Sequence, residues 1–312
     1  MLDSLGFILG TTLMYSTPLI YTALGGVISE NSGVVNIGLE GMMTIGALIG
    51  ATVGFYSGNP WLAFFMAGLS GGILALFHAI ASVTFGADQV ISGIAMNFLG
   101  PGLALFLSRI FFEGATMTKP ISLENKMPRP LNGLFPRNSF FDQILNQYST
   151  VYIAFILVFI IWYLLYKTKL GLRIRAVGEH PKAADTLGVN VFRIRYLCII
   201  LSGVFAGFGG ASMSLAIVSS FRPTLVSGQG FIALAAMIFG KWKPQGAMWA
   251  CLLFGLSNGL VVFLGGAKSP VQISEQLLSM IPYILTLIIL TGFVGRASAP
   301  AASGQPYEKG EN

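Results

Sequence analysis

Long stretches without any charged residue occupy most of this sequence, and they limit what the chain can fold into. The uncharged runs are 4–29, 41–87, 89–108, 143–166, 196–221, 223–240, 244–267 and 276–295. A helix that crosses a bilayer needs about 20 consecutive, mostly apolar residues, and most of these runs are long enough. Only 10% of the residues are charged, whereas soluble domains carry about 25%. The sequence therefore predicts a protein that crosses a membrane many times.

The same runs favour helices over strands. Inside lipid only helices and closed barrels satisfy their own backbone hydrogen bonds, and the sequence lacks the alternating pattern of barrel strands. We expect an all-α integral membrane protein, a polytopic helical bundle of about 8–10 transmembrane segments with broken or re-entrant helices. The expected crossings are 5–27, 33–56, 61–83, 89–112, 148–166, 196–217, 229–240, 246–265 and 278–294. Of these, 229–240 is too short to span straight.

Two hydrophilic segments predict the orientation of the chain. The segment 113–147 contains four prolines and reads as an irregular loop. The segment 167–195 holds seven Lys/Arg residues against two acids, which the positive-inside rule assigns to the cytoplasm. Counting crossings then places 113–147 outside. We expect residues 1–295 to form the transmembrane domain, and the small, polar residues 296–312 to form a disordered cytoplasmic tail.

Glu40 is a lone carboxylate in the apolar stretch 33–43, GVVNIGLEGMM. A charged group near the bilayer centre costs about 2.5–3.5 kcal/mol, so such residues face a cavity or find partners. The glycines of the stretch, together with Asn36, indicate a broken or tightly packed helix. Alternatively, Glu40 lies near a helix N-terminus at the membrane surface, where the helix dipole and water favour it.

A second polar set lies at the start of the run 89–108. Asp88 fits the N-cap of a helix that begins there. Positions 89, 93, 96, 97 and 100 share a helical face rich in small or polar residues, which predicts that this face looks toward other helices or a lumen. The candidates for a substrate pathway are Asn36, Glu40, Gln89, Ser92, Asn97 and Asn258. His78, alone in an apolar segment, reads as a packed, hydrogen-bonded histidine.

The basic segment contains a short pattern that a membrane anchor alone does not explain. Residues 178–188 read GEHPKAADTLG, an Ala-Ala-x3-Gly pattern flanked by charges. Small residues on a short helix let another protein dock closely, and the final glycine permits a sharp helix exit. The candidates for this docking are Gly178, Glu179, Ala183, Ala184, Asp185 and Gly188.

Several chemistries are missing from the sequence. It has no G-x4-G-K-[ST] loop, HExxH or G-x-S-x-G motif. We therefore expect no catalytic residues, no metal site and no cofactor in this chain. Positive charge clustered beside membrane spans does not indicate nucleic acid binding. A transporter without its own energy source is either passive or driven by a partner.

Three stretches resemble one family of transport proteins. GVVNIGLEGMM (33–43) resembles the second-helix signature of permease subunits in bacterial ABC importers of the branched-chain amino acid and simple-sugar group. LGLRIRAVGEHPKAADTLGVNVFRIRYLCIILSGVFAGFGGA (170–211) resembles their cytoplasmic coupling segment, and ALAAMIFGKWKPQGAMWACLLFG (233–255) resembles their late helix pair. The resemblance runs over most of 15–295. It is closest to nucleoside permeases that work with a basic-membrane-protein-type lipoprotein.

The resemblance implies a multi-pass permease domain in a bacterial cell membrane and a set of partners. These are a second homologous permease subunit, cytoplasmic ATPases that bind ATP and dock around 179–188, and an extracellular substrate-binding lipoprotein. It also implies that Asn36 and Glu40 lie near the pathway on a broken second helix. The Ala-Ala-x3-Gly pattern matches the coupling motif of ABC importers only in part.

Few charges suit a neutral substrate, and the polar side chains suit sugar hydroxyls and base edges. Nucleosides are the expected substrates. Ribose-like sugars fit the same set of polar side chains. Branched-chain amino acids are less well supported, because their zwitterion would need charged partners. The rival class is a self-sufficient secondary transporter or channel, which would move solute without an ATPase.

Overall fold

The computed structural model describes residues 2–137, 139–266 and 298–308, together with single positions between 277 and 288. Every regular element in these residues is helical, and seven helices are long and apolar enough to cross a membrane. They are α1 (Leu2–Glu30), α2 (Leu39–Ser57), α3 (Pro60–Ala79), α4 (Gln89–Phe111), α6 (Ser149–Lys167), α9 (Val191–Ser212) and α11 (Pro244–Gly265). The chain is thus an all-helical, multi-pass membrane protein, as predicted. Apart from a few single positions, the expected crossing 278–294 lies outside the described residues.

Four shorter helices complete the described bundle. They are α5 (Phe140–Leu145), α7 (Lys169–Glu179), α8 (Pro181–Thr186) and α10 (Gln229–Phe239). Single turns of 3-10 helix (Leu123–Asn125) and π-helix (Ile80–Thr84 and Met213–Ile217) lie in the first long loop and at the ends of α3 and α9. The 11 residues of α10 span about 16 Å, roughly half a bilayer. The prediction that 229–240 does not cross the membrane straight is therefore confirmed.

Side chains that accept hydrogen bonds from the first backbone N–H groups mark the start of two spanning helices. Asn59 accepts from the backbone N–H groups of Trp61 and Leu62, and Pro60 fills the first turn of α3, where it loses no hydrogen bond. Asp88 Oδ1 accepts from Val90 N and Ile91 N, both at 2.9 Å. The predicted N-cap role of Asp88 is confirmed.

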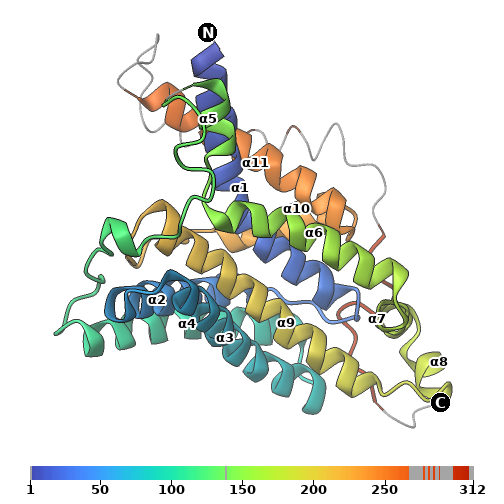
Figure 1. Cartoon of the computed structure of the whole chain (residues 1–312). Helices are drawn as coiled ribbons and strands as arrows, with labels where there is room; N and C mark the ends of the chain where they lie inside the picture. Colours follow the sequence, from blue (N-terminus) through green and yellow to red (C-terminus); the bar gives the residue numbers. More distant parts are fainter. Residues whose placement is uncertain are drawn as a thin grey trace.

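Helix α9 is the central helix of the bundle, with α1, α2 and α3 packed against it (Figure 1). Glycines allow the backbones to meet. A Cβ atom on Gly46 of α2 would lie only 2.5 Å from the Cα of Gly207 on α9. Any side chain at Gly46 would therefore separate the two helices, because this approach is closer than van der Waals contact.

The second spanning segment is not helical from its start. The sequence predicts a crossing from residue 33, but α2 begins at Leu39. Residues 31–38 form turns and extended backbone that lead from the end of α1 into the bundle. The predicted break near the glycines is confirmed, and we call residues 31–38 the unwound segment.

The ends of the bundle carry different segments. α7, α8 and the last described residues, up to 308, lie together, while the loop that follows α4 lies at the opposite end (Figure 1). Helix α5 packs against the N-terminal part of α1. The two hydrophilic segments, 113–147 and 167–195, thus occupy opposite ends. This arrangement agrees with the predicted sidedness, although which end faces the cytoplasm remains a prediction.

The expectation of a disordered tail is wrong for residues 298–308. Ala302 is only 4% exposed, and its backbone N–H donates to the carbonyl oxygen of Gly178 at 2.9 Å. The small, polar composition predicts disorder because it offers little apolar surface to bury. Here hydrogen bonds to neighbouring helices order the segment instead, and we call residues 298–308 the C-terminal strap.

Candidate functional site

Polar side chains from neighbouring helices replace the hydrogen bonds that the unwound segment lacks. Val35 N donates to Gln89 Oε1 at 2.7 Å. Val35 O lies 3.1 Å from His78 Nε2, and a carbonyl oxygen only accepts, so Nε2 carries the proton. Both backbone groups of Val35 are therefore satisfied inside the bundle by α3 and α4, as backbone buried at membrane depth requires.

Asn97 joins the unwound segment to the start of α2. Its Nδ2 donates to Ile37 O at 2.9 Å, and its Oδ1 accepts from Gly41 N at 2.9 Å. Asn97 lies eight residues into α4, which begins at Gln89, so the contact is about 12 Å along that helix. The break in the second span is therefore fixed deep within the bundle.

His78 is fully buried and completes this network. Because Nε2 donates to Val35, Nδ1 accepts the hydrogen bond from Ser92 Oγ at 2.9 Å. His78 is thus a packed, hydrogen-bonded histidine, as predicted. The structure brings Gln89, Ser92 and Asn97 together around the unwound segment, and their role in a substrate pathway remains a prediction.

The carboxylate of Glu40 bonds the N-terminus of the half-span helix α10. Its Oε1 accepts from Gly228 N at 2.6 Å, and its Oε2 accepts from Gly230 N at 2.7 Å. A negative charge is favourable here because the first N–H groups of α10 have no partner within the helix. A Cβ atom on Gly230 would lie 2.6 Å from the Glu40 Cα, so the contact depends on glycine. This geometry favours the partnered Glu40 over one at the membrane surface.

Asn36 and Asn258 lie apart from this contact. Asn36 is fully buried and donates from Nδ2 to Ser202 Oγ of α9 at 3.0 Å. Its Oδ1 is buried and has no hydrogen-bond partner among the described residues. Asn258 lies on α11, which packs against α1, α6 and α10. The structure therefore does not bring Asn258 into the group around the unwound segment.

Helix α8 forms the tip of the basic segment and ends as its sequence predicts. Gly188 has a φ of +81°, and its N–H donates to Asp185 O at 2.9 Å. The next N–H, that of Val189, donates to Ala184 O at 3.0 Å. This pair of hydrogen bonds is a Schellman motif, which ends a helix at a left-handed residue and turns the chain sharply.

The exposed side chains of α8 differ from the predicted set. Ala184 is buried, with 3% of its surface exposed, so it packs against the bundle rather than facing a partner. Ala183 is exposed, and Leu187 is 84% exposed. Sequence reasoning missed Leu187, although an apolar residue directly before the helix-ending glycine was the available signal. Leu187 is thus an exposed apolar side chain at the tip of α8, near the small residue Ala183.

Three other predicted docking residues face the C-terminal strap. Gly178 O accepts from Ala302 N, and Glu179 Oε2 accepts from Ala301 N at 3.3 Å. Desolvation and a hydrogen bond with Asp185 raise the pKa of the Tyr307 phenol. The strap contacts were not predictable, because the small, polar sequence of 298–308 carries no periodic pattern.

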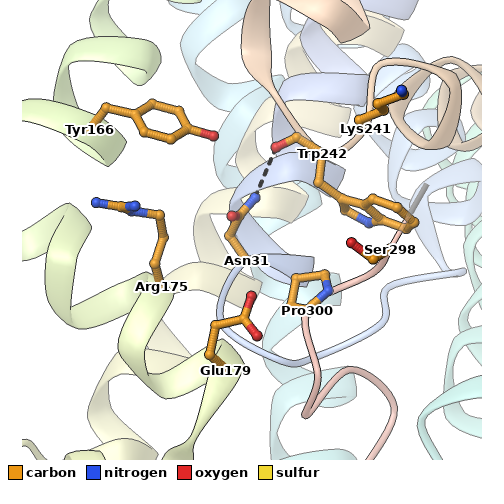
Figure 2. Close-up of a pocket in the computed structure, with 8 residues that line it drawn as sticks. All are labelled: Asn31, Tyr166, Arg175, Glu179, Lys241, Trp242, Ser298 and Pro300. Carbon is orange, nitrogen blue, oxygen red and sulfur yellow. Dashed lines mark hydrogen bonds between the residues drawn. The ribbon is translucent and has the colours of Figure 1, made fainter. Parts of the chain in front are cut away.

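A polar cavity of about 240 Å³ separates α7 from the turn between α10 and α11. Figure 2 shows Arg175 on one side, Trp242 on the other and Asn31 between them. Asn31 Nδ2 donates to Trp242 O at 3.1 Å. The end of α1 is thus bonded to the turn that follows α10. The lining residues are Asn31, Tyr166, Arg175, Glu179, Lys241, Trp242, Ser298 and Pro300.

The chain is similar to known proteins over nearly its whole length. The profile of a family described as branched-chain amino acid transport system / permease component matches residues 8–290. The guanosine ABC transporter permease protein NupQ of Bacillus subtilis (strain 168) is 45% identical, and the match covers 98% of each chain. The nucleoside ABC transporter permease protein NupC of Lactococcus lactis subsp. cremoris (strain MG1363) is 42% identical, again over 98% of each chain. The guanosine ABC transporter permease protein NupP of Bacillus subtilis (strain 168) is 25% identical over 98% of this chain and 86% of its own length.

Proposed function

The chain belongs to the family of branched-chain amino acid transport system permease components, and from this premise we propose that it is the membrane-spanning permease subunit of an ATP-driven ABC importer for nucleosides. One observation carries the proposal. NupQ and NupC, at 45% and 42% identity over 98% of the chain, are both named as permeases for guanosine or nucleosides. The family also includes permeases for other solutes, so the substrate needs a direct test.

The proposed assembly has two different permease subunits. Bacillus subtilis carries two guanosine permease proteins, NupQ and NupP, which are 45% and 25% identical to this chain. Such a pair supports a partner that is a diverged relative rather than a second copy of this chain. Cytoplasmic ATPases and an extracellular substrate-binding lipoprotein complete the transporter.

Energy enters this chain through α8. Leu187 is 84% exposed at the tip of the helix, and Ala183 beside it leaves room for close approach of a partner. An exposed apolar side chain surrounded by small residues can act as the anchor of an interface. The cytoplasmic ATPases dock on this surface, bind the ATP that this chain does not, and move α8 when they close.

The substrate moves by alternating access, without covalent chemistry in this chain. Nucleosides are neutral at pH 7, so a pathway needs hydrogen-bonding groups more than charges. The exposed aromatic rings of Phe98 and Phe231 can stack on a base, and Asn36 Oδ1, which has no hydrogen-bond partner among the described residues, can accept a hydrogen bond. Because the carboxylate of Glu40 is already bonded to α10, we assign it to positioning that short helix.

Uptake in cells tests the proposal. Cells with and without this gene are given labelled guanosine, ribose or leucine in separate assays. We expect the gene to be required for guanosine uptake, with ribose and leucine uptake unchanged. Gene-dependent uptake of ribose or leucine, without guanosine, would replace the nucleoside assignment with a sugar or amino acid one.

A further inference from the structure

We propose that the C-terminal strap, residues 298–308, is a mechanical link that carries movement of α8 to the unwound segment of the second span. The proposal rests on the proposed function, because it takes α8 as the point where an ATPase acts. It assigns a role to a segment whose sequence predicts only a disordered tail. The link has three described connections: one to the α7–α8 region, one to α9 and one to α4.

The first connection ties the strap to the segment that would bind the ATPase. Ala302 N donates to Gly178 O at 2.9 Å, and Ala301 N donates to the carboxylate of Glu179 at 3.3 Å. The carboxylate of Asp185 in α8 lies close enough to the Tyr307 phenol to raise its pKa. These contacts lie on both sides of the joint between α7 and α8, so a movement of α8 displaces the strap.

The second connection ties the strap to α9. Arg195 is 1% exposed, and its Nη1 donates to Gln305 O at 3.0 Å. The Tyr307 ring lies against the same guanidinium, with its centroid 6.0 Å from Cζ. The Tyr307 ring also packs edge-on against Phe192, 5.6 Å away. A buried guanidinium is costly unless it is bonded, so Arg195 holds the strap close to α9.

Some of the hydrogen-bond donors of Arg195 are not bonded to the strap. Its Nε and Nη2 atoms are buried without hydrogen-bond partners among the described residues. A Cβ atom on Gly33 would lie 3.1 Å from Nη2, so the guanidinium lies beside the unwound segment. The same side chain therefore contacts the strap and borders the break.

The third connection reaches the unwound segment through one side chain. Gln89 is 1% exposed, and its Nε2 donates to Gln305 O at 3.4 Å. Its Oε1 accepts from Val35 N at 2.7 Å. A displacement of Gln305 therefore acts on Val35 through a single amide group. Distant sites can be coupled when a connected series of contacts between them can adopt two different packed arrangements. The proposal takes the strap, Gln89 and Val35 as such a series.

Two variants that lift the strap test the proposal in the complete transporter. The first is a chain that ends after Ala297, and the second is Ala302→Arg, which puts a long side chain at a buried position. We expect both variants to insert and to co-purify with the ATPase, which hydrolyses ATP at the normal rate. Guanosine uptake per inserted transporter should fall about tenfold, because movement of α8 no longer reaches the unwound segment.

The matched control is Ala299→Arg, which makes the same substitution in the same segment. Ala299 is exposed, and none of the three connections involves it. Uptake by this variant should stay within about twofold of the unmodified transporter, as expected for a surface substitution. Normal uptake by the truncated chain would overturn the proposal. Loss of ATPase binding in the truncated chain would also overturn it, since the strap would then be part of the docking surface.

The test separates failure of the link from failure of the proposed function. If the unmodified transporter takes up no guanosine, the nucleoside assignment fails. The link is then measured by the stimulation of ATP hydrolysis that a loaded binding protein produces. The link predicts that the truncated chain keeps basal hydrolysis and loses this stimulation, while full stimulation would count against it.

Discussion

At the scale of single residues, several polar side chains of the bundle bond backbone groups that lack a partner within their own helix. Gln89, His78 and Asn97 each bond to backbone atoms in or beside the unwound segment. Glu40 bonds backbone N–H groups at the start of α10. Interrupted helices are possible inside a membrane only when such bonds are made. The few polar side chains in this sequence therefore support its two irregular spans.

Replacing Glu40 with alanine should weaken the protein, because the N–H groups of Gly228 and Gly230 lose their acceptors. Leaving buried donors unsatisfied costs about 1–3 kcal/mol. Thermal unfolding of the detergent-purified protein should begin at a lower temperature, and guanosine uptake should fall. Glu40→Gln keeps one acceptor oxygen, so its unfolding temperature and uptake should lie between those of the unmodified protein and those of Glu40→Ala.

The control for Glu40→Ala is Glu124→Ala, because Glu124 is an exposed acid in the loop after α4. This change should leave both unfolding and uptake unaltered. An unaltered melting temperature and normal uptake for Glu40→Ala would show that α10 does not depend on the carboxylate.

At the scale of elements, most helices were predictable and their contacts were not. Uncharged runs predicted the spans to within a few residues, because apolar length is what a bilayer selects. The glycines around Glu40 predicted the break, and the length of 229–240 predicted a half-span helix. The hydrogen bond from Val35 to Gln89 joins residues 54 positions apart, and no local pattern encodes such a pairing.

The docking surface shows the same limit. The Ala-Ala-x3-Gly pattern predicted a short helix with a sharp end, and Gly188 has the left-handed conformation that ends it. The pattern did not show which alanine faces outward. Ala184 is buried and Ala183 is exposed, because the direction of α8 is set by the packing of α7 and the strap. A bulky residue at position 184 should therefore disturb the packing of α8 before it affects docking.

Leu187→Asp tests α8 as the docking element. A charge on the exposed tip should weaken ATPase binding about tenfold or more, as expected when an apolar anchor is lost. The amount of ATPase that co-purifies with the permease measures this. Leu134→Asp is the matched control, because Leu134 is also exposed, at 66%, and lies in the loop at the opposite end of the bundle. Equal ATPase recovery with both variants would exclude α8 as the contact.

At the scale of the whole molecule, the described residues form a bundle that holds two interrupted spans deep inside, and in the proposed function movement enters the bundle at one end. The α7–α8 segment and the strap lie at that end (Figure 1). Family membership and the two close nucleoside permease relatives give this arrangement its function. Sequence patterns predicted the segments of this bundle, but the order of the strap depends on contacts with four helices, α4, α7, α8 and α9.

Reconstitution of the purified chain in lipid vesicles tests dependence on partners. We expect no guanosine flux from the chain alone, with or without an ion gradient. Flux should appear when the second permease, the ATPase and the binding protein are added with ATP. The measurement is labelled guanosine inside the vesicles. Steady flux through the single polypeptide would instead identify a secondary transporter or channel.

The contact between Gly46 and Gly207 limits how the subunit can change shape. The two backbones touch without an intervening side chain, so α2 and α9 cannot move closer together. Moving them apart would open a void in the bundle. Packed interiors resist such voids. The pair should therefore pivot as one rigid body during each transport cycle, and the hinges that let the subunit open must lie outside this contact.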